Sequence, residues 1–471
     1  MKKSYITTAI PYVNGVPHLG HAMDYLLADT MRRYLVRGGE EVRLQAGTDE
    51  HGSKVFQKAE ASGVPVEKFV DENAKKFQDF IHALGVEYTD FVRTTDPEHE
   101  RRCQEIWVKL GKYIYKDAYE GWYCEGCEGF VTEKEYEENN GVCPDHQKPY
   151  VRLSEENYYL RIADFKERMR SAIENDEMKI TPAGRKKEFL NLLVDMPDVS
   201  ISRPKKQLSW GVPVPGDDTQ VMYVWIDALA NYITVLGYPD KDISEWWPAE
   251  VQVIGKDILR FHAGIWPAIL MGLNLPLPKN LLTHGYITVN GEKMSKSVGN
   301  VVDPRVVLDK YGVDAFRYYF LRHVSTMEDA DYSDEKYESA YNELANDLGN
   351  LVQRLATLCV KGEMTGQTMI ERQRDDKFDE LMGKYEFNVA FDYVWAKVQG
   401  LNKKIDTEKP WELVKTDPEK LVMVLDSLVS EILGVADLLE VFIPETAKKI
   451  VEIFSAEKIV PPETSLFPRT R

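Results

Sequence analysis

The chain has 471 residues and a mass of 54.1 kDa, and its 59 basic and 77 acidic side chains leave a formal net charge of −18. This length suggests about three domains, and 43% hydrophobic and 29% charged residues exclude a chain that is disordered throughout. The acidic balance argues against a non-specific nucleic-acid coat or a binder of anionic membranes, although it leaves room for a local basic face.

The first fifty residues predict a β-α-β unit. A β-rich run covers residues 4–10, apolar residues then recur at helical spacing over 22–35, and a second β-rich run covers 41–47. Strand, helix and strand at this spacing imply a parallel sheet with a right-handed crossover. Ligands bind beyond the carboxyl ends of the strands in such sheets, and polar turns at 14–21 and 48–52 fall at those ends.

The first of these turns carries His18, Leu19, Gly20 and His21, where the first strand leads into its helix. Backbone N–H groups and the positive end of a helix dipole favour an anion there, and two imidazoles separated by a small residue can reach phosphates. Two polar turn histidines beside a tight-turn glycine are the alternative. Because the chain contains neither a GxxxxGK[ST] nor a GxGxxG motif, this turn is the best place for a nucleotide if one binds.

Three of the five cysteines gather with a histidine in the middle of the chain. The spacing Cys124-x2-Cys127-x15-Cys143-x2-His146 places two ligand pairs on two tight turns, which predicts a tetrahedral Cys3His zinc site. Four protein ligands leave no open position, so we expect one Zn²⁺ ion with a structural role. The other two cysteines are expected to be plain buried residues.

Residues 115–206, which contain this cluster, look like an insertion. Strand candidates resume at 221–226, 251–254 and 281–289, and long amphipathic helices replace them from about residue 334. We therefore predict an α/β fold: a Rossmann-type parallel-sheet domain with a zinc-bearing insertion, followed by an all-α helical bundle. The predicted divisions are 1–114 (first half of the sheet domain), 115–206 (insertion), 207–290 (second half), 291–333 (a loop and connecting segment) and 334–471 (helical bundle).

Lys293, Met294, Ser295, Lys296 and Ser297 lie between two glycines, just after a predicted strand. Two ammonium groups on a glycine-hinged loop can close over a triphosphate and stabilise the charge that develops as pyrophosphate leaves. A solvated charged hairpin is the alternative for such a loop alone. The presence of this loop after the histidine turn, in that order, favours nucleotide chemistry.

Together the two motifs resemble the paired signatures of class I aminoacyl-tRNA synthetases. The surrounding segments resemble the methionyl-tRNA synthetase family within that class, and the resemblance extends over nearly the whole chain. The segments that carry it are 9–15 (AIPYVNG), 47–52 (GTDEHG), 223–228 (YVWIDA) and 255–257 (GKD), the last leading to Phe261 and His262. Each segment alone is weak, and the combination is specific.

The resemblance implies a methionine pocket and an ATP site. Asp49 would hold the α-ammonium group, an ion pair suited to a partly desolvated site, and aromatic residues around Trp225 would enclose the thioether. Ordinary core packing is the alternative for those aromatic residues taken alone. The implied methionine-binding residues are Ile10, Tyr12, Asp49, Trp225, Ala228, Tyr232 and His262. The implied ATP-binding residues are His18, Gly20, His21, Asp24, Asp257, Lys293 and Lys296, where Asp24 replaces the glutamate more usual in the family.

The resemblance also implies the reaction, an ATP-dependent ligation that forms methionyl-tRNA. The methionine carboxylate would attack the α-phosphorus of ATP, so the first step would depend on positioning and charge stabilisation. His18, His21, Lys293 and Lys296 are the implied catalytic residues, and Mg²⁺ would accompany the ATP. The methionyl group would then pass to the 3′-terminal ribose of tRNA(Met), both initiator and elongator.

The helical region carries a further candidate site. A leucine stripe at helical spacing runs from residue 344 to 358, and polar residues including Asn350 and Arg354 lie on the opposite side of the same helix. Such a face is most often only solvated, and Trp411 alone would fit a core. However, residues 350–354 and 410–411 resemble the anticodon-reading elements of the family. Because amide and guanidinium groups bind splayed base edges and indole stacks on them, Asn350, Arg354 and Trp411 are the implied anticodon-binding residues.

Two other interpretations remain open. The chain could be another class I synthetase or a nucleotidyltransferase of the same superfamily, or it could be a non-catalytic tRNA-binding relative. Synthetases for branched aliphatic amino acids typically need a large editing insertion, whereas the insertion here is small, and a simple nucleotidyltransferase does not need the helical region. The intact histidine and lysine motifs argue against a non-catalytic protein.

Location and assembly are predicted from weaker signals. No secretory signal follows the first residues, and the longest apolar stretch, 263–273, is too short for a bilayer. A clustered set of cysteines without a disulfide framework suits a reducing compartment, so we expect a cytoplasmic protein with no membrane partner. The chain stops before the dimerising module that many members of the family carry, and we expect a monomer.

Overall fold

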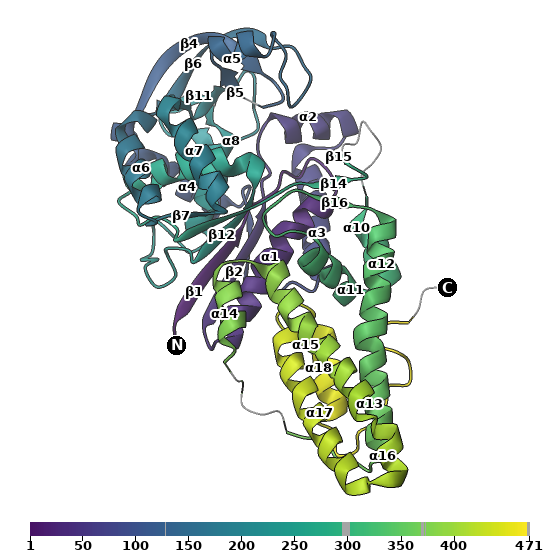
Figure 1. Ribbon diagram of the computed structural model, residues 1–471. Helices are drawn as coiled ribbons and strands as arrows, with labels where there is room; N and C mark the ends of the chain where they lie inside the picture. The colour runs from purple at the N-terminus through teal and green to yellow at the C-terminus, as the bar shows by residue number, and fades with distance from the viewer. Residues whose placement is uncertain (128, 294–301, 369–371, 373, 469–471) are drawn as a thin grey trace.

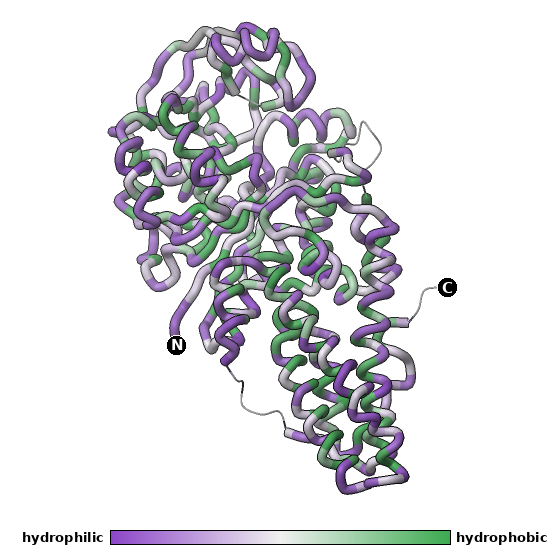
Figure 2. Tube along the Cα trace, in the orientation of Figure 1, coloured by the Kyte–Doolittle hydropathy of each residue, from purple (hydrophilic) through white to green (hydrophobic). Residues whose placement is uncertain are grey.

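The structure, a computed structural model, describes residues 1–127, 129–293, 302–368, 372 and 374–468. Figure 1 shows an α/β part that contains the N-terminus and a bundle of long helices that extends away from it. Hydrophobic stretches lie between the long helices of the bundle, whereas their outer turns are largely hydrophilic (Figure 2). No helix in these ranges has the length and apolar character that crossing a bilayer requires.

The α/β part is built on a six-stranded sheet in which all neighbouring strands are parallel. The strand order is β3 (Asp90–Arg93), β2 (Glu41–Thr48), β1 (Lys3–Thr8), β12 (Val251–Gly255), β13 (Asn280–His284) and β7 (Lys179–Thr181). The chain leaves the central strand β1 first toward β2 and later returns on its other side at β12. Such a switch point places the ligand crevice beyond the carboxyl ends of β1 and β12.

Helices cover the sheet, whose strands are buried on both faces, as parallel strands usually are. The predicted helix between the first two strands is present and forms α1. The helices of this part are α1 (Leu19–Arg37), α2 (Ser53–Ser62), α3 (Val66–Ala83), α4 (Pro97–Lys109), α8 (Val224–Thr234) and α9 (Trp266–Gly272), with short turns at Gly111–Tyr113, Lys256–Ile258 and Phe261–Ile265.

The inserted range carries smaller antiparallel sheets. One has the order β5 (Gly129–Val131), β4 (Ile114–Cys124), β6 (Val151–Leu160) and β8 (Val199–Ser200), and another has the order β10 (Pro213–Val214), β11 (Asp217–Met222) and β9 (Ser202–Pro204). Helices α5 (Glu133–Glu138), α6 (Lys166–Glu174) and α7 (Ala183–Asp195) and a turn at Ile162–Phe165 accompany them. The predicted insertion, 115–206, is not fully separate from the main sheet. β7 lies inside that range and pairs with β13.

One strand prediction is wrong. Residues 221–226 are predicted as a single strand, whereas β11 ends at Met222 and α8 begins at Val224. This run is apolar throughout, and a short apolar run does not distinguish a buried strand from a buried helix. An acidic residue in the first turn, Asp227, favours the helix through the helix dipole.

Beyond the sheet the chain is mainly helical, apart from a small sheet of β15 (Glu292–Lys293), β14 (Ile287–Val289) and β16 (Ala330–Tyr332). α12 (Asp334–Leu344) continues through Ala345–Gly349 into α13 (Asn350–Lys361), and the predicted leucine stripe along them is at most 5% exposed. The other helices are α10 (Pro304–Tyr311), α11 (Val313–Tyr318) with a turn at Tyr319–His323, α14 (Asp376–Gly383), α15 (Phe387–Glu408), α16 (Pro410–Thr416), α17 (Pro418–Leu439) and α18 (Pro444–Phe454).

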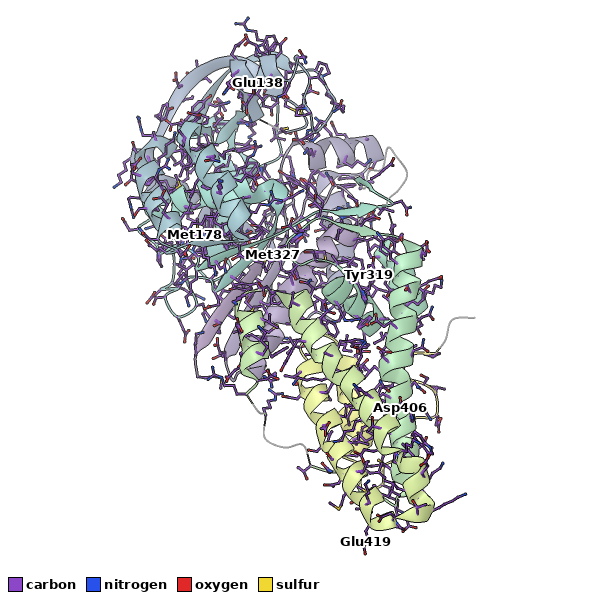
Figure 3. All side chains as sticks on the ribbon, viewed as in Figure 1. Glu138, Met178, Tyr319, Met327, Asp406 and Glu419 are labelled. Atoms are coloured by element: carbon purple, nitrogen blue, oxygen red, sulfur yellow. The ribbon has the colours of Figure 1, made fainter. Side chains whose placement is uncertain are left out.

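The bundle and the sheet share one hydrophobic core. At their junction, the buried guanidinium of Arg317 on α11 lies 2.8 Å from Asp29 of α1 and donates to the carbonyl of Phe442 at 2.6 Å. A buried ion pair with such additional hydrogen bonds has little freedom to move. The bundle is therefore fixed against α1, although it extends far from the insertion: Glu138 and Glu419 mark the two ends of the molecule in Figure 3.

Candidate active site

A cavity of about 900 Å³ lies beyond the carboxyl ends of β1, β2, β12 and β13. This volume is within the range of ligand-binding sites, and the position is the one that the sheet topology indicates. Residues from distant parts of the sequence meet there. The predicted site residues that line it are Ile10, Tyr12, His18, Gly20, His21, Asp24, Asp49, Trp225 and Asp257.

His18 and His21 cap the first turn of α1. His18 Nδ1 accepts from the backbone N–H of Gly20 at 3.1 Å, and the backbone N–H of His18 donates to His21 Nδ1 at 3.2 Å. The rings stack with centroids 3.7 Å apart. Because both Nδ1 atoms accept, each neutral ring carries its proton on Nε2 and can donate to a phosphate oxygen. A Cβ on Gly20 would lie 3.0 Å from the His18 ring, so this arrangement favours glycine.

Asp49 lies beside Tyr12, and their backbones form a parallel bridge. The N–H of Asp49 donates to the carbonyl of Pro11 at 2.9 Å, and the N–H of Val13 donates to the carbonyl of Asp49 at 3.1 Å. Only 3% of Asp49 is exposed. A carboxylate so strongly desolvated suits a cationic partner such as an ammonium group.

Trp225, at the start of α8, forms an aromatic wall of the cavity. It stacks on Phe261 with ring centroids 3.8 Å apart and an interplanar angle of 7°, and it contacts His262 edge-on at 6.2 Å. Among the described residues, those that line the cavity do not include Ala228, Tyr232 or His262. All three are buried one layer deeper.

The deeper layer is polar but uncharged. The Tyr232 hydroxyl donates to His262 Nε2 at 2.7 Å, so Nδ1 keeps the ring proton and donates to the carbonyl of Ile258 at 3.1 Å. Burial lowers the pKa of His262 to about 4, which keeps the ring neutral at physiological pH. An aromatic wall above a neutral layer suits an unbranched thioether side chain.

Asp24 pairs with His284, a residue that sequence reasoning missed. Asp24 Oδ1 lies 3.0 Å from His284 Nε2. Burial raises the pKa of the Asp24 carboxyl despite this contact. Burial lowers the pKa of His284, but the attraction of Asp24 outweighs it and the net shift is upward. The usable signal was position: His284 ends β13, just as Asp257 follows β12, and strand ends carry the ligand site.

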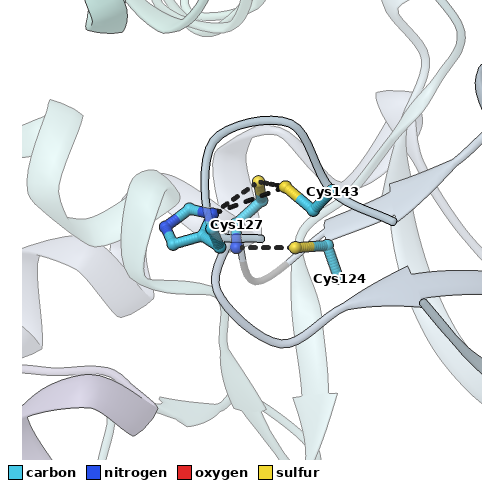
Figure 4. Close-up of side chains that lie close together, drawn as sticks. Cys124, Cys127 and Cys143 are labelled. Carbon is cyan, nitrogen blue, oxygen red and sulfur yellow. Dashed lines mark hydrogen bonds between the residues drawn. The ribbon is translucent and has the colours of Figure 1, made fainter. Parts of the chain in front are cut away.

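Cys124, Cys127, Cys143 and His146 converge in the insertion, as their spacing predicts (Figure 4). Their ligand atoms all lie within 4.8 Å of one another, and the Sγ atoms of Cys127 and Cys143 are 3.6 Å apart. A tetrahedron with Zn–S bonds of about 2.3 Å has edges of about 3.8 Å, so this donor set fits Zn²⁺. Cys127 and His146 also line the cavity, which puts the cluster at its edge.

Comparison with known proteins matches the geometry. A family model described as tRNA synthetases class I (M) matches residues 4–152 and 145–356. The methionine–tRNA ligase of Caldanaerobacter subterraneus subsp. tengcongensis is 40% identical over 475 residues, which cover 96% of this chain and 74% of the relative. The chain belongs to the class I methionyl-tRNA synthetase family.

Other members of the family are also similar over most of their length. The methionine–tRNA ligase of Brucella melitensis is 38% identical over 97% of this chain and 92% of the relative. The structure of a Mycobacterium tuberculosis methionyl-tRNA synthetase in complex with methionyl-adenylate is 33% identical, and it covers 100% of both chains with a TM-score of 0.91. The fold of that solved structure is therefore shared by the whole of this chain.

The bundle carries the residues that resemble the anticodon site of the methionyl-tRNA synthetases, namely Asn350, Arg354 and Trp411, which we call the bundle face. The Arg354 guanidinium lies 5.0 Å from the centre of the Trp411 ring and 2.6 Å from Asp406 Oδ1. Trp411 is 39% exposed, so it is not the core residue that the sequence left as an alternative. Asn350 is exposed one helical turn before Arg354, on the same side of α13.

The lysine motif is the remaining predicted element of the family's ATP site. Lys293 ends β15, which pairs with β14, and Ile287 of β14 lines the cavity. Lys296 lies outside the described residues. The backbone of the motif thus begins next to the cavity.

Proposed function

We propose that the chain is a methionyl-tRNA synthetase, which activates methionine with ATP to methionyl-adenylate and pyrophosphate and transfers the methionyl group to the 3′-terminal ribose of tRNA(Met). The observation that carries this proposal is one cavity lined by the His18 and His21 turn, Asp49 and Trp225. Donors for phosphate, an acceptor for ammonium and an aromatic wall meet in a single volume. Full-length similarity to a synthetase solved with methionyl-adenylate supports the same assignment.

The amino acid would lie between Asp49 and Trp225. The Asp49 carboxylate pairs with the α-ammonium group, and Ile10 and Tyr12 flank it on the β1 side. The thioether packs on Trp225, which Tyr232 and His262 support from below together with Ala228. Because these groups are neutral, the pocket disfavours a charged side chain of similar length.

The first step needs positioned charge rather than proton transfer. A carboxylate oxygen of methionine forms a bond to the α-phosphorus of ATP while the bond from that phosphorus to the leaving pyrophosphate breaks. His18 and His21 would donate from Nε2 to phosphate oxygens, and Gly20 allows the backbone to approach them. Lys293 and Lys296, with Mg²⁺, would offset the charge on pyrophosphate, and Asp24 and Asp257 would hold the ribose.

The tRNA would bridge the two parts of the molecule. The bundle face would read the unstacked anticodon bases, of initiator and elongator tRNA(Met) alike, while the acceptor end reaches the cavity. The zinc would have a structural role, since four protein ligands close its coordination. Because one chain supplies all the residues of the cavity, we propose that the monomer is active.

Amino-acid-dependent ATP–pyrophosphate exchange, measured with each of the twenty amino acids, tests this function. Exchange that depends on methionine alone is the expected result. Exchange with a different amino acid would indicate another class I synthetase. A chain that binds tRNA(Met) but catalyses no exchange would be a non-catalytic relative, and the proposal would be wrong.

A further inference from the structure

A buried ion pair outside the cavity connects the segment after β2 to α8. His51 Nδ1 lies 2.7 Å from Asp227 Oδ2, and the two residues are 2% and 0% exposed. On the other side of the ring, His51 Nε2 lies 3.5 Å from Glu100 Oε1 of α4. The ring also contacts Trp210, with ring centroids 5.5 Å apart. The proposed reaction uses none of these groups.

The surroundings keep His51 charged. Burial lowers its pKa, but Asp227 and Glu100 outweigh burial and raise the pKa of His51 to about 10. His51 is therefore an imidazolium at neutral pH, and each of its N–H groups faces a carboxylate. Asp227 lies in the first turn of α8, where the helix dipole also favours negative charge. Loss of either partner would leave an uncompensated buried charge, so the pair resists separation.

This pair connects the two halves of the methionine pocket. His51 follows Asp49 by two residues, and Asp227 follows Trp225 by two residues. Asp49 would hold the ammonium group, and Trp225 would contact the thioether. The contact of His51 with Asp227 therefore joins the segment that carries Asp49 to the first turn of the helix that carries Trp225.

A second buried contact also joins β2 to α8. The side-chain amide of Gln45 on β2 donates to Asn231 Oδ1 on α8 at 2.8 Å, and both residues are fully buried. This neutral contact involves a residue inside β2, before the strand ends at Thr48. His51 and Asp227 meet just beyond the end of β2, two residues after Asp49, whose backbone is bonded to the chain that follows β1.

Rigid spacing matters for an amino acid that is held at both ends. One methylene group gives only modest discrimination in an apolar pocket, and small misplacements of bound groups reduce reactivity strongly. A pocket whose ends can drift apart would accept longer side chains and bind the correct one more weakly.

We propose that His51 and Asp227 are positioning residues that fix the spacing between Asp49 and Trp225 and thereby set the length of the amino acid that is accepted. This inference rests on the proposed function, because it assigns the two ends of methionine to those residues. It adds a determinant of specificity that does not touch the substrate.

The test compares the full chain with His51→Gln and Asp227→Asn in ATP–pyrophosphate exchange, using methionine and ethionine, which is longer by one methylene. We expect each variant to raise the KM for methionine about ten-fold and to change the KM for ATP by less than about two-fold. The preference for methionine over ethionine should fall about five-fold. In the double variant the KM effects should not add, because either change already breaks the pair.

A matched control is available on the same strand. Arg43 and Asp90 form a partly buried pair at the opposite end of β2, where Arg43 Nε donates to Asp90 Oδ2 at 3.0 Å. Asp90→Asn should lower the melting temperature and leave the KM for methionine and the preference over ethionine unchanged. A change in those two quantities equal to that of the His51 variant would mean that general destabilisation is responsible, and would overturn the proposal.

Glu100→Gln keeps the inference testable if both pocket-side variants fail to fold. This change neutralises the carboxylate that lies farther from His51, on a partly exposed helix. It should raise the KM for methionine about two-fold and leave the KM for ATP unchanged. An unchanged KM in a folded variant, or equal shifts for methionine and ATP, would overturn the inference alone. Absence of methionine-dependent exchange in the wild-type chain would refute the proposed function together with the inference.

Discussion

The cavity and the bundle face use similar side chains but bury them very differently. Around the cavity, the side chains of His51 and Asp227 are 3% and 0% exposed. On the bundle face, the ion pair of Arg354 and Asp406 has side chains that are 30% and 64% exposed, and Trp411 is 39% exposed. Charges interact strongly in a buried site and weakly in water, where ions screen them.

This difference suits the two proposed tasks. Activation of a small amino acid requires groups that stay in place, and buried, mutually bonded pairs provide that. Reading anticodon bases requires side chains that can change partners, and an exposed ion pair worth only about 0–1 kcal/mol can exchange Asp406 for a base. Perturbing each region separately should therefore give effects of different size and on different steps.

The largest expected effect comes from removing zinc, whose ligands lie at the edge of the cavity and far from the bundle face. Chelation or Cys127→Ser should lower the stability of the insertion by at least about 3 kcal/mol, because metal binding supplies folding free energy. Exchange activity should fall as well, since Cys127 and His146 line the cavity. Calorimetry measures the loss of stability, ATP–pyrophosphate exchange measures the loss of activity, and metal analysis should find one zinc per chain before removal.

A cysteine outside the cluster, Cys359, provides the control for zinc removal. Cys359 is buried in the bundle, away from the cluster. Cys359→Ser should keep one zinc per chain and the full exchange rate. An undisturbed melting curve after complete zinc removal would contradict a structural metal and separate the cluster from the cavity.

The next effect concerns the histidine turn. His21→Asn should lower the exchange kcat by about 10²–10³-fold, the usual result of losing a preorganised donor to developing charge. Asparagine can still accept the cap hydrogen bond from His18, so the melting temperature should change little. Stopped-flow measurement of adenylate formation and a thermal melt test the two expectations. A rate within a few fold of wild type would remove His21 from the mechanism.

The sequence predicted the parts of the site that lie in continuous motifs. Three of these parts are local patterns whose chemistry can be predicted from the sequence: the turn with His18 and His21, Asp49 after β2, and the Cys3His spacing. Contacts between distant strands and helices cannot be predicted in this way. The pairing of Asp24 with His284 joins residues 260 positions apart, and that of His51 with Asp227 joins residues 176 positions apart. No spacing rule connects them, because sheet order decides which strand ends meet.

Short apolar segments set the other limit of prediction. Residues 221–226 read as a strand, yet the helix begins at Val224, and this error affects the site because α8 carries Trp225 and Asp227. The opposite case is Trp411, for which a core position and a surface position were both compatible with the sequence. Only the packing of α16 against the bundle decides that its ring is exposed beside Arg354.

A change of pH should destabilise the cavity without acting through the bundle face. The pKa of His262 is about 4 in the folded chain, below its usual value of 6.5. The folded state therefore binds fewer protons than the unfolded state, and stability is lost as pH falls from about 6.5 to about 4. The shift corresponds to about 3 kcal/mol. Denaturant titrations at pH 7 and pH 4 measure how much the free energy of unfolding drops between these two pH values. In His262→Gln, which keeps a donor and an acceptor, this drop should be smaller than in the wild type by about 3 kcal/mol. Equal drops in the two proteins would contradict a neutral buried ring.

The smallest effect is expected at the bundle face, and it should appear in one step only. Trp411→Ala should lower kcat/KM for charging of tRNA(Met) about ten-fold, because stacking of one base on an aromatic ring is worth about 1–3 kcal/mol. Trp411→Phe should recover much of this loss. ATP–pyrophosphate exchange should stay unchanged in both variants, since the ring is exposed and lies on a helix that does not reach the cavity. Equal losses in charging and exchange would show that the ring supports the fold after all, and that the two regions are less independent than their burial suggests.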